Sequence, residues 1–185
     1  QSNQSGSPPL YFPIFSESAG AERAIPIADP LRQFSGGVVI DSAVQFGGAE
    51  ANVICNFFRD PTVDFSLLVG FRYADLREKL QNHNSTTDLL FGNVTVLSDT
   101  FQTINQFYGG QLGGRFGFQR DWLSLGVTGK IAIGSIHQIV NVQGDITQSG
   151  PNPLVPPGPG TFPGGIFAQS SNIGRGNANP VSVPF

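Results

Sequence analysis

The sequence predicts an all-β protein, an antiparallel up-and-down β-sheet of about five or six strands joined by short turns and long loops. Three observations predict it. Long runs alternate apolar and polar residues with the period of two that a strand imposes. Charged residues make up only 12% of the 185 residues, against roughly 25% in soluble globular domains, so the polar positions hold neutral side chains. The 24 Gly and 14 Pro leave little sequence suited to helices.

Composition also excludes several classes of protein. No run of 18 apolar residues is present, so no transmembrane helix is expected. A formal net charge of −3 without a basic block gives nucleic acid nothing to bind. The single Cys excludes an internal disulfide framework and a Cys-based zinc cluster. The chain begins at Gln1 with no Met and no signal peptide, which indicates a processed product or a fragment.

The sequence predicts two regions. Residues 1–37 are expected to be an irregular, loop-rich N-terminal segment, because Pro, Ser and Gly interrupt its apolar stretches. A short helix over 19–24 is the alternative there. Residues 38–185 are expected to form the antiparallel β-barrel domain.

Four long runs of alternation make up most of this domain. One face is apolar in each run, at odd-numbered positions in the first, second and fourth and at even-numbered positions in the third. A weaker fifth strand and the start of a sixth follow. The six runs span residues 38–57, 62–73, 101–119, 122–142, 166–171 and 181–185.

The predicted connections alternate between short and long. Residues 58–61 and the pair Arg120-Asp121 are expected to be tight turns, whereas 81–98 and 144–165 are expected to be long loops. This order is typical of bacterial transmembrane β-barrels. Hairpins joined by long loops also occur in soluble β-proteins.

The two tight turns fix the register of two hairpins. The first turn places Phe57 opposite Val63, and the second places Gln119 opposite Trp122 and Gln111 opposite Lys130. In both hairpins the cross-strand partners then lie on the same face, as strand pairing requires.

The apolar face is compatible with two architectures. In a transmembrane β-barrel it meets lipid and the polar face lines a lumen, whereas in a soluble β-sandwich it meets a second sheet. The runs are longer than the roughly 9–11 residues that cross a bilayer. The polar face carries Asn, Gln, Ser and Gly rather than the Lys and Glu that protect exposed sheets. Both features favour a partial transmembrane β-barrel, with the sandwich as the alternative.

One stretch resembles a known family. Residues 100–113 resemble the signature of the BBP7 family, outer-membrane β-barrel proteins abundant in planctomycetes. Residues 48–52, 67–73 and 171–175 are similar to further stretches of that family in the same order, so the resemblance covers roughly 40–180. It implies a bacterial outer-membrane barrel without an established substrate. The family-like motif is Asn105, Gln106, Phe107, Tyr108, Gly109, Gly110, Gln111, Leu112 and Gly113.

The resemblance also predicts an incomplete barrel. Family members tend to continue past the segment 172–175 into further strands, whereas this chain ends at Phe185. Pro180 and Pro184 interrupt the strand that a terminal Phe would need as an insertion signal. Known barrels use at least eight strands. We therefore expect closure to need remaining strands of the parent chain or a homo-oligomer.

The expected lumen face carries scattered polar and charged side chains. Glu50 and Arg72 are the expected ion pair, because an unpaired charge in a narrow lumen is costly. One interpretation is a cluster that selects solutes, and the other is a lattice of ion pairs that braces the wall. The candidate lumen-facing residues are Glu50, Asn52, Arg72, Gln111, Arg115 and Lys130.

No residues predict catalysis, a metal site or a cofactor. His83 and His137 lie far apart, and the glycines at 109–110 and 113–114 lack the Lys-Ser/Thr of a phosphate loop. Cys55 is expected to be a small buried hydrophobe. The remaining aromatic candidates predict a girdle at a membrane interface, with core packing as the alternative. They are Tyr73, Tyr108, Phe118 and Trp122.

Two functions stay open from the sequence. The first is a non-enzymatic barrel in contact with outer-membrane lipid, with a structural role or porin-like passage of solutes. The second is a soluble or cell-surface β-sandwich that acts in binding or adhesion. An enzyme is a third, for which no Ser/His/acid arrangement is visible.

Overall fold

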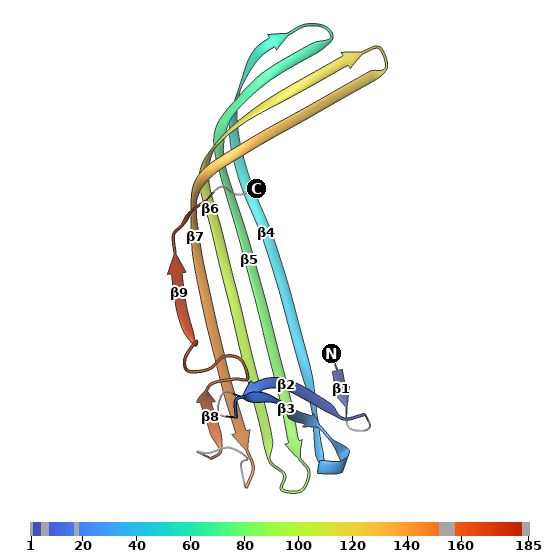
Figure 1. Cartoon of the computed structure of the whole chain (residues 1–185), viewed down its shortest axis with the longest axis vertical. Coiled ribbons are helices and arrows are strands. Elements are labelled where there is room, and N and C mark those ends of the chain that lie inside the picture. Colours follow the sequence, from blue (N-terminus) through green and yellow to red (C-terminus); the bar gives the residue numbers. More distant parts are fainter. Residues whose placement is uncertain (1, 5–7, 17–18, 152–157, 183–185) are drawn as a thin grey trace. The chain divides into compact units, whose positions relative to one another are not determined.

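A computed structural model describes residues 2–4, 8–16, 19–151 and 158–182. The fold is antiparallel and almost entirely β, which confirms the predicted fold class. Its frame is a meander of four long strands (Figure 1). These strands are β4 (Phe34–Arg59), β5 (Val63–Asp88), β6 (Val94–Arg120) and β7 (Leu123–Ser149).

The main sheet has eight strands among the described residues, six of which follow the path β1-β4-β5-β6-β7-β10. Strand β1 (Ser2–Gln4) pairs with β4, and β10 (Val181–Ser182) pairs with β7. Two further short strands, β8 (Gly160–Pro163) and β9 (Gly174–Ala178), also pair with β7. Among the described residues the two ends of this path do not pair with each other, so the sheet is not closed into a barrel.

The N-terminal segment is more regular than expected. Strands β2 (Leu10–Ser16) and β3 (Ala21–Ala28) form an antiparallel hairpin, followed by a short 3-10 helix, η1 (Pro30–Arg32). The expectations of an irregular segment and of a helix over 19–24 are therefore wrong for these residues. Pro13 and Pro26 hid the hairpin in the sequence, but a two-stranded ribbon has a free edge on both sides where Pro is tolerated.

The predicted long loops are mostly strand. Strand β5 continues to Asp88 and β6 begins at Val94, so only residues 89–93 connect them instead of 81–98. Likewise, β7 continues to Ser149, and β8 lies within the loop predicted over 144–165, of which 152–157 fall outside the described residues. Polarity hid the end of β5, because Asn82, Asn84 and Thr86 are buried by other parts of the chain.

The end of the chain also departs from the prediction. Residues 166–171 form bends, a turn and irregular backbone, so the expected fifth strand is absent there. The predicted sixth strand begins as expected, since β10 covers Val181–Ser182; residues 183–185 lie outside the described residues.

Both tight turns lie slightly later than predicted. Residues 60–62 connect β4 to β5, and Asp121-Trp122 connect β6 to β7. Phe57 consequently stacks edge-on against Phe65, with ring centroids 6.2 Å apart, rather than opposing Val63. Lys130 similarly lies beside Gly113 instead of Gln111. Each register differs from the prediction by two residues, so the assignment of side chains to faces survives.

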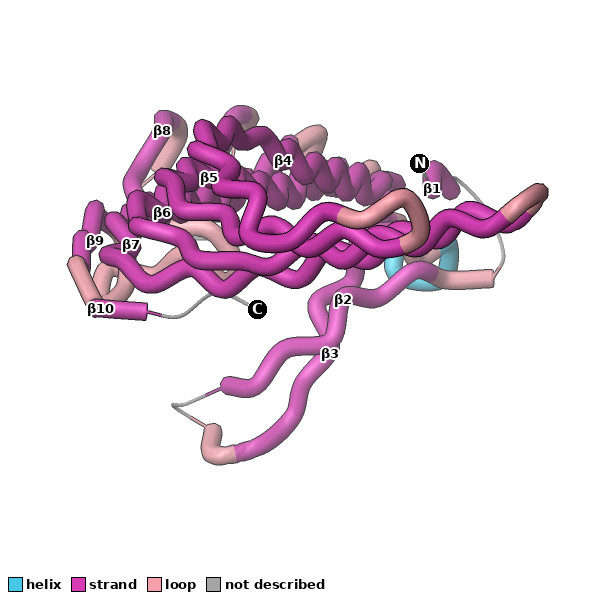
Figure 2. The backbone as a smooth tube through the Cα atoms, turned by 90° about the horizontal axis from the view of Figure 1, so that it is seen from above, coloured by secondary structure: helices cyan, strands magenta, loops and turns pink. Residues whose placement is uncertain are grey.

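The chain forms two compact units. The first unit holds residues 1–43, 78–102 and 140–175, and the second holds 44–77, 103–139 and 176–185. In the first unit the hairpin β2–β3 lies on one side of the sheet (Figure 2), and Ile27, Ala28 and Ala168 are completely buried. In the second unit, few apolar residues are buried, and Phe107 is the largest of them in the described part of the chain.

Candidate functional site: the two faces of the sheet

A hydrogen-bonded polar network lies on one face of the second unit. The side-chain amide of Gln111, only 3% exposed, donates from Nε2 to Glu50 Oε2 at 3.2 Å and to Asn52 Oδ1. The Nζ of Lys130 forms an ion pair with Glu50 Oε1. Four of the six predicted site residues, from three different strands, therefore meet. After this network we call this side of the sheet the polar face: even-numbered residues of β4, β5 and β7, and odd-numbered residues of β6. On β4 it also exposes Val44, Phe46, Ile54 and Phe58.

The network depends on a glycine in the neighbouring strand. A Cβ atom at Gly70 would lie 2.1 Å from Ala51 O and 2.4 Å from Asn52 Oδ1. Any side chain there would displace Asn52 and the amide of Gln111 bonded to it. Gly70 therefore gives the two amides the space to meet across the face of β5.

The other two predicted residues lie outside this network. Arg72 lines a pocket of about 250 Å³ with Glu50, but the ion pair of Glu50 is with Lys130, so the expected Glu50–Arg72 pair is wrong. Arg115 lines a separate pocket of about 410 Å³ that also contains Arg59 and Asp64. This pocket is not purely polar, because Ile54 and Phe58 line it as well.

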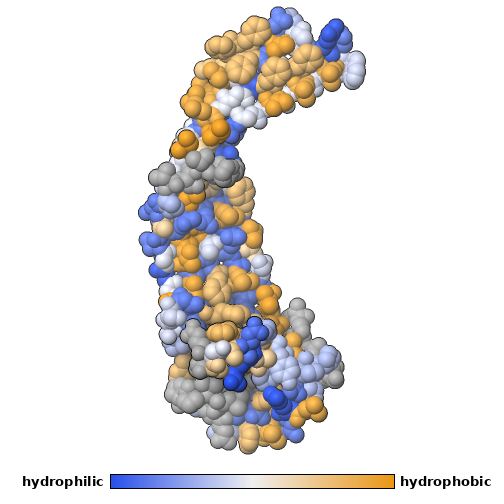
Figure 3. Space-filling view, in the orientation of Figure 1, coloured by the Kyte–Doolittle hydropathy of each residue, from blue (hydrophilic) through white to orange (hydrophobic). Residues whose placement is uncertain are grey.

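The opposite face of the second unit, which we call the apolar face, exposes large hydrophobic side chains. Figure 3 shows hydrophobic residues gathered over the ends of the β4–β5 and β6–β7 hairpins. Cys55 also lies on this face and is exposed, contrary to its predicted burial. The exposed fractions range from 42% to 76% for Val53, Phe57, Leu67, Val69, Phe71, Leu112, Phe116, Leu123, Leu125, Val127, Ile131 and Ile133.

An aromatic pair lies at one end of this apolar surface. The rings of Tyr73 and Tyr108 are 5.0 Å apart, and Gln106 Nε2 donates to Tyr73 Oη at 3.3 Å. The family-like motif of residues 105–113 thus divides between the faces, with Gln106 and Tyr108 on the apolar face and Phe107 and Gln111 buried on the other. Trp122, in the turn after β6, is 91% exposed.

The first unit contains a buried carboxylate that the sequence analysis did not single out. Asp99, 1% exposed, accepts hydrogen bonds from the backbone N–H groups of Ile166, Phe167 and Ala168. Its partners lie 67–69 residues away in the chain. No local signal points to it, because residues 82–88 of the facing strand β5 are polar at every position and show no alternation.

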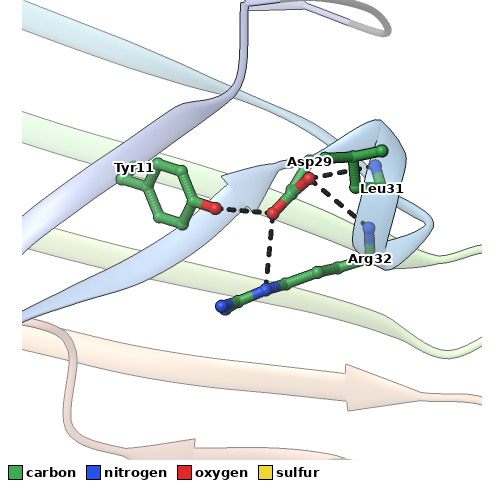
Figure 4. Close-up of polar contacts among 4 residues, drawn as sticks. All are labelled: Tyr11, Asp29, Leu31 and Arg32. Carbon is green, nitrogen blue, oxygen red and sulfur yellow. Dashed lines mark hydrogen bonds and ion pairs between the residues drawn. The ribbon is translucent and has the colours of Figure 1, made fainter.

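A second buried carboxylate holds the base of the hairpin β2–β3 (Figure 4). Asp29 accepts from Tyr11 Oη at 2.5 Å and from the backbone N–H of Leu31 at 3.0 Å, and it pairs with Arg32. The hydrogen bond from Tyr11 lowers the pKa of Asp29, and the same bond raises the pKa of Tyr11.

Within the described residues, no group of three or more His, Cys, Asp and Glu side chains is placed to hold a metal ion. The two His residues stay apart, with His83 beside Ser98 and His137 beside Asn179. No helix in this part of the chain is long and apolar enough to span a membrane.

Comparison with known proteins identified one family. The model of the family described as "Putative beta barrel porin-7 (BBP7)" matches residues 1–183. No curated protein and no solved structure matched significantly. The match extends beyond the segments that carried the resemblance and includes the hairpin β2–β3.

Proposed function

Because the chain belongs to the beta barrel porin-7 family, we propose that it forms wall strands of a bacterial outer-membrane β-barrel that lets small polar solutes pass. The family name points to a membrane barrel and to a non-enzymatic role. The outer-membrane location and the passage of solutes are our proposal, argued from the two faces of the second unit.

The observation that carries this proposal is the height of the apolar band. On β5 it extends from Val63 to Tyr73 and on β7 from Leu123 to Ile133, which is 11 residues in each strand. A tilted strand needs about 9–11 residues to cross the hydrocarbon core. Polar residues begin directly beyond the band, at Asp75 on β5 and Ser135 on β7. The band therefore has the height that a bilayer requires.

The surroundings of the band also favour lipid as its partner. Exposed apolar patches on soluble monomers rarely exceed about 600 Å², whereas this face exposes a dozen large side chains over four strands. Tyr73 and Tyr108 lie where an interfacial aromatic girdle is expected. Arg59 and Arg120 end their strands beside the turns, at the level where headgroups would accept a positive charge.

The polar face supports a water-filled interior. The ion pair of Glu50 with Lys130 is too polar for hydrocarbon, but it suits a lumen. Lipid also requires every backbone group to be satisfied. We therefore propose that the stretches of β4 and β7 that β1, β8, β9 and β10 leave unpaired among the described residues pair with further strands of the same protein or of another copy.

The test is electrical and biochemical. The native protein should resist extraction from membranes by alkaline carbonate, migrate faster on gels before heating than after, and give ohmic conductance in planar bilayers. Release by carbonate would contradict membrane insertion and favour the soluble sandwich. An integral protein without conductance would leave a structural wall and contradict passage.

A further inference from the structure

Two segments of the chain dock on the polar face of the sheet in the first unit, the hairpin only through its base, since residues 21–24 are exposed and the hairpin extends away from the sheet in Figure 2. One is the hairpin β2–β3, and the other is the loop of residues 164–173, which lies between β8 and β9 (Figures 1 and 2). Ile27 and Ala168 of these segments are completely buried. The sheet residues that they cover are polar, yet Asn82, Asn84 and Asp99 are only 5%, 0% and 1% exposed.

The covered residues have the parity that defines the polar face, even-numbered in β5 and odd-numbered in β6. The β5–β6 pair has the same register at both of its ends. At one end Asp88 N donates to Asn93 O, and at the other Gln119 N donates to Thr62 O, each at 2.8 Å. The pair therefore runs without a net bulge, and the even-numbered residues of β5 keep one face throughout. On the proposed function, this face is the wall of the passage.

Asp99 attaches the loop to the sheet. Its Oδ1 accepts from Phe167 N at 3.2 Å and Ala168 N at 2.9 Å. Its Oδ2 accepts from Ile166 N at 3.2 Å and from Asn82 Nδ2 at 3.5 Å. Hydrogen bonds to a carboxylate are stronger than neutral ones, and a buried carboxylate without partners would be very costly. The loop and Asp99 therefore stabilise each other's positions.

The loop also holds a shape of its own. Gln169 Nε2 donates to Gly165 O and Asn172 Nδ2 donates to Phe167 O, both at 2.9 Å. A Cβ atom at Gly165 would lie 1.9 Å from Asp99 Oδ1, so only glycine allows this approach. The ring of Phe167 packs edge-on against Phe12 of β2 at 5.5 Å, which joins the loop to the hairpin.

The covered surface keeps the character of a water-lined one. Both polar side-chain atoms of Asn84, Oδ1 of Asn82 and Oγ1 of Thr95 have no hydrogen-bond partner among the residues that the structure describes. A face built for permanent burial is normally apolar or fully hydrogen-bonded. Water would satisfy these groups once the cover left, so uncovering this face costs less than exposing an apolar core.

We propose that the hairpin β2–β3 and the loop of residues 164–173 form a plug that narrows the polar passage, with Asp99 as its anchor. This plug rests on the proposed function, because only a passage can be plugged. Loss of the anchor releases the loop from the wall and widens the passage to solutes.

The test combines accessibility with conductance in the native protein carrying C55S and N84C. Cys55 is the only Cys of the chain and is exposed, so C55S removes background labelling. The thiol introduced by N84C lies beneath the plug and should react slowly with a water-soluble maleimide. D99A removes the anchor, and G165V blocks docking while keeping the carboxylate. D41A, which removes an exposed carboxylate from β4 of the same unit, is the matched control.

We expect D99A and G165V to speed labelling at least tenfold and to raise single-channel conductance at least twofold, with heat-modifiable migration retained. D41A should change neither. Equal labelling in all variants would overturn the plug. Faster labelling with unchanged conductance would also overturn it, while the passage itself would stand. No conductance in any variant or in the native protein would overturn the passage, and the plug with it.

Discussion

Replacing Asp99 by Asn should loosen the loop of residues 164–173 without separating the long strands. The two carboxylate oxygens face donors on both sides: Phe167 N and Ala168 N on one, Ile166 N and Asn82 Nδ2 on the other. An Asn amide has one oxygen and one NH₂ group. Whichever way the introduced Asn amide is turned, its NH₂ group replaces one carboxylate oxygen and faces N–H donors, so the hydrogen bonds that this oxygen accepted are lost.

The magnitude follows from the bonds affected. With the amide oxygen kept toward Phe167 and Ala168, the bond from Ile166 is lost, worth about 1.5–3 kcal/mol to a charged acceptor. The 3.5 Å contact from Asn82 adds little. The bonds from Phe167 N and Ala168 N become weaker because their acceptor is no longer charged. This loss is partly offset, because burying a neutral amide costs less desolvation energy than burying a carboxylate. We expect a net loss of about 2–3 kcal/mol, or roughly 30- to 140-fold in the opening equilibrium.

Hydrogen exchange of the amides of residues 166–168 measures this opening directly, because Asp99 is their hydrogen-bond acceptor. D99N should speed their exchange by that factor, while peptides from β5 and β6 keep their native rates. D41N removes one exposed charge from the same unit and should change nothing. A change below about threefold would refute the assignment of Asp99 as anchor, and an equal acceleration in β5 and β6 would show global unfolding instead.

Three further predictions test the proposed wall and the hairpin. K130Q leaves Glu50 without its ion pair, so the reversal potential in a salt gradient should shift toward cations; an unchanged potential would place this pair outside the conducting path. V69R puts a charge on the apolar face, where Val69 is 52% exposed, and should cost about 2–4 kcal/mol of folding into lipid vesicles, whereas N56R on the polar face should fold normally. The lowered pKa of Asp29 means that its contribution to hairpin stability is present above the ordinary carboxyl pKa and is lost as pH falls through the lowered value. The protection factors of the amides in β2 and β3, which are exchange rates corrected for their intrinsic pH dependence, should therefore fall on acidification, and D29N should abolish that fall.

The polar network could be predicted from the sequence because it depends on parity more than on exact register. Glu50, Asn52, Gln111 and Lys130 were assigned to one face by alternation alone. Both turns were misplaced, but each register moved by two residues, which returns every side chain to the same side. The partner of Glu50 did not follow from the register. Arg72 lies across from Glu50 in the neighbouring strand, yet the carboxylate pairs with Lys130 of β7 and accepts from the amide of Gln111 between them.

The cover of the first unit could not be predicted in this way. Its strongest contacts join Asp99 to residues 166–168, and no local pattern indicates a partner so distant in the chain. Residues 81–98 have the composition of a loop, and all but the connection 89–93 are strand because other segments bury one of their faces. Burial supplied by tertiary structure overrides local propensity here.

The length of β5 is explained by these two environments together. Its 26 residues exceed what a bilayer needs by more than a factor of two, which is unexpected for a strand with a single role. Its apolar-face residues change from Leu67, Val69 and Phe71 to Lys79, Gln81 and His83, and an apolar environment would penalise the second set. On the proposed function, lipid therefore contacts only the stretch in the second unit. The stretch in the first unit is then stabilised by the segments docked on its polar face, and the strand is long because each stretch is buried by a different partner.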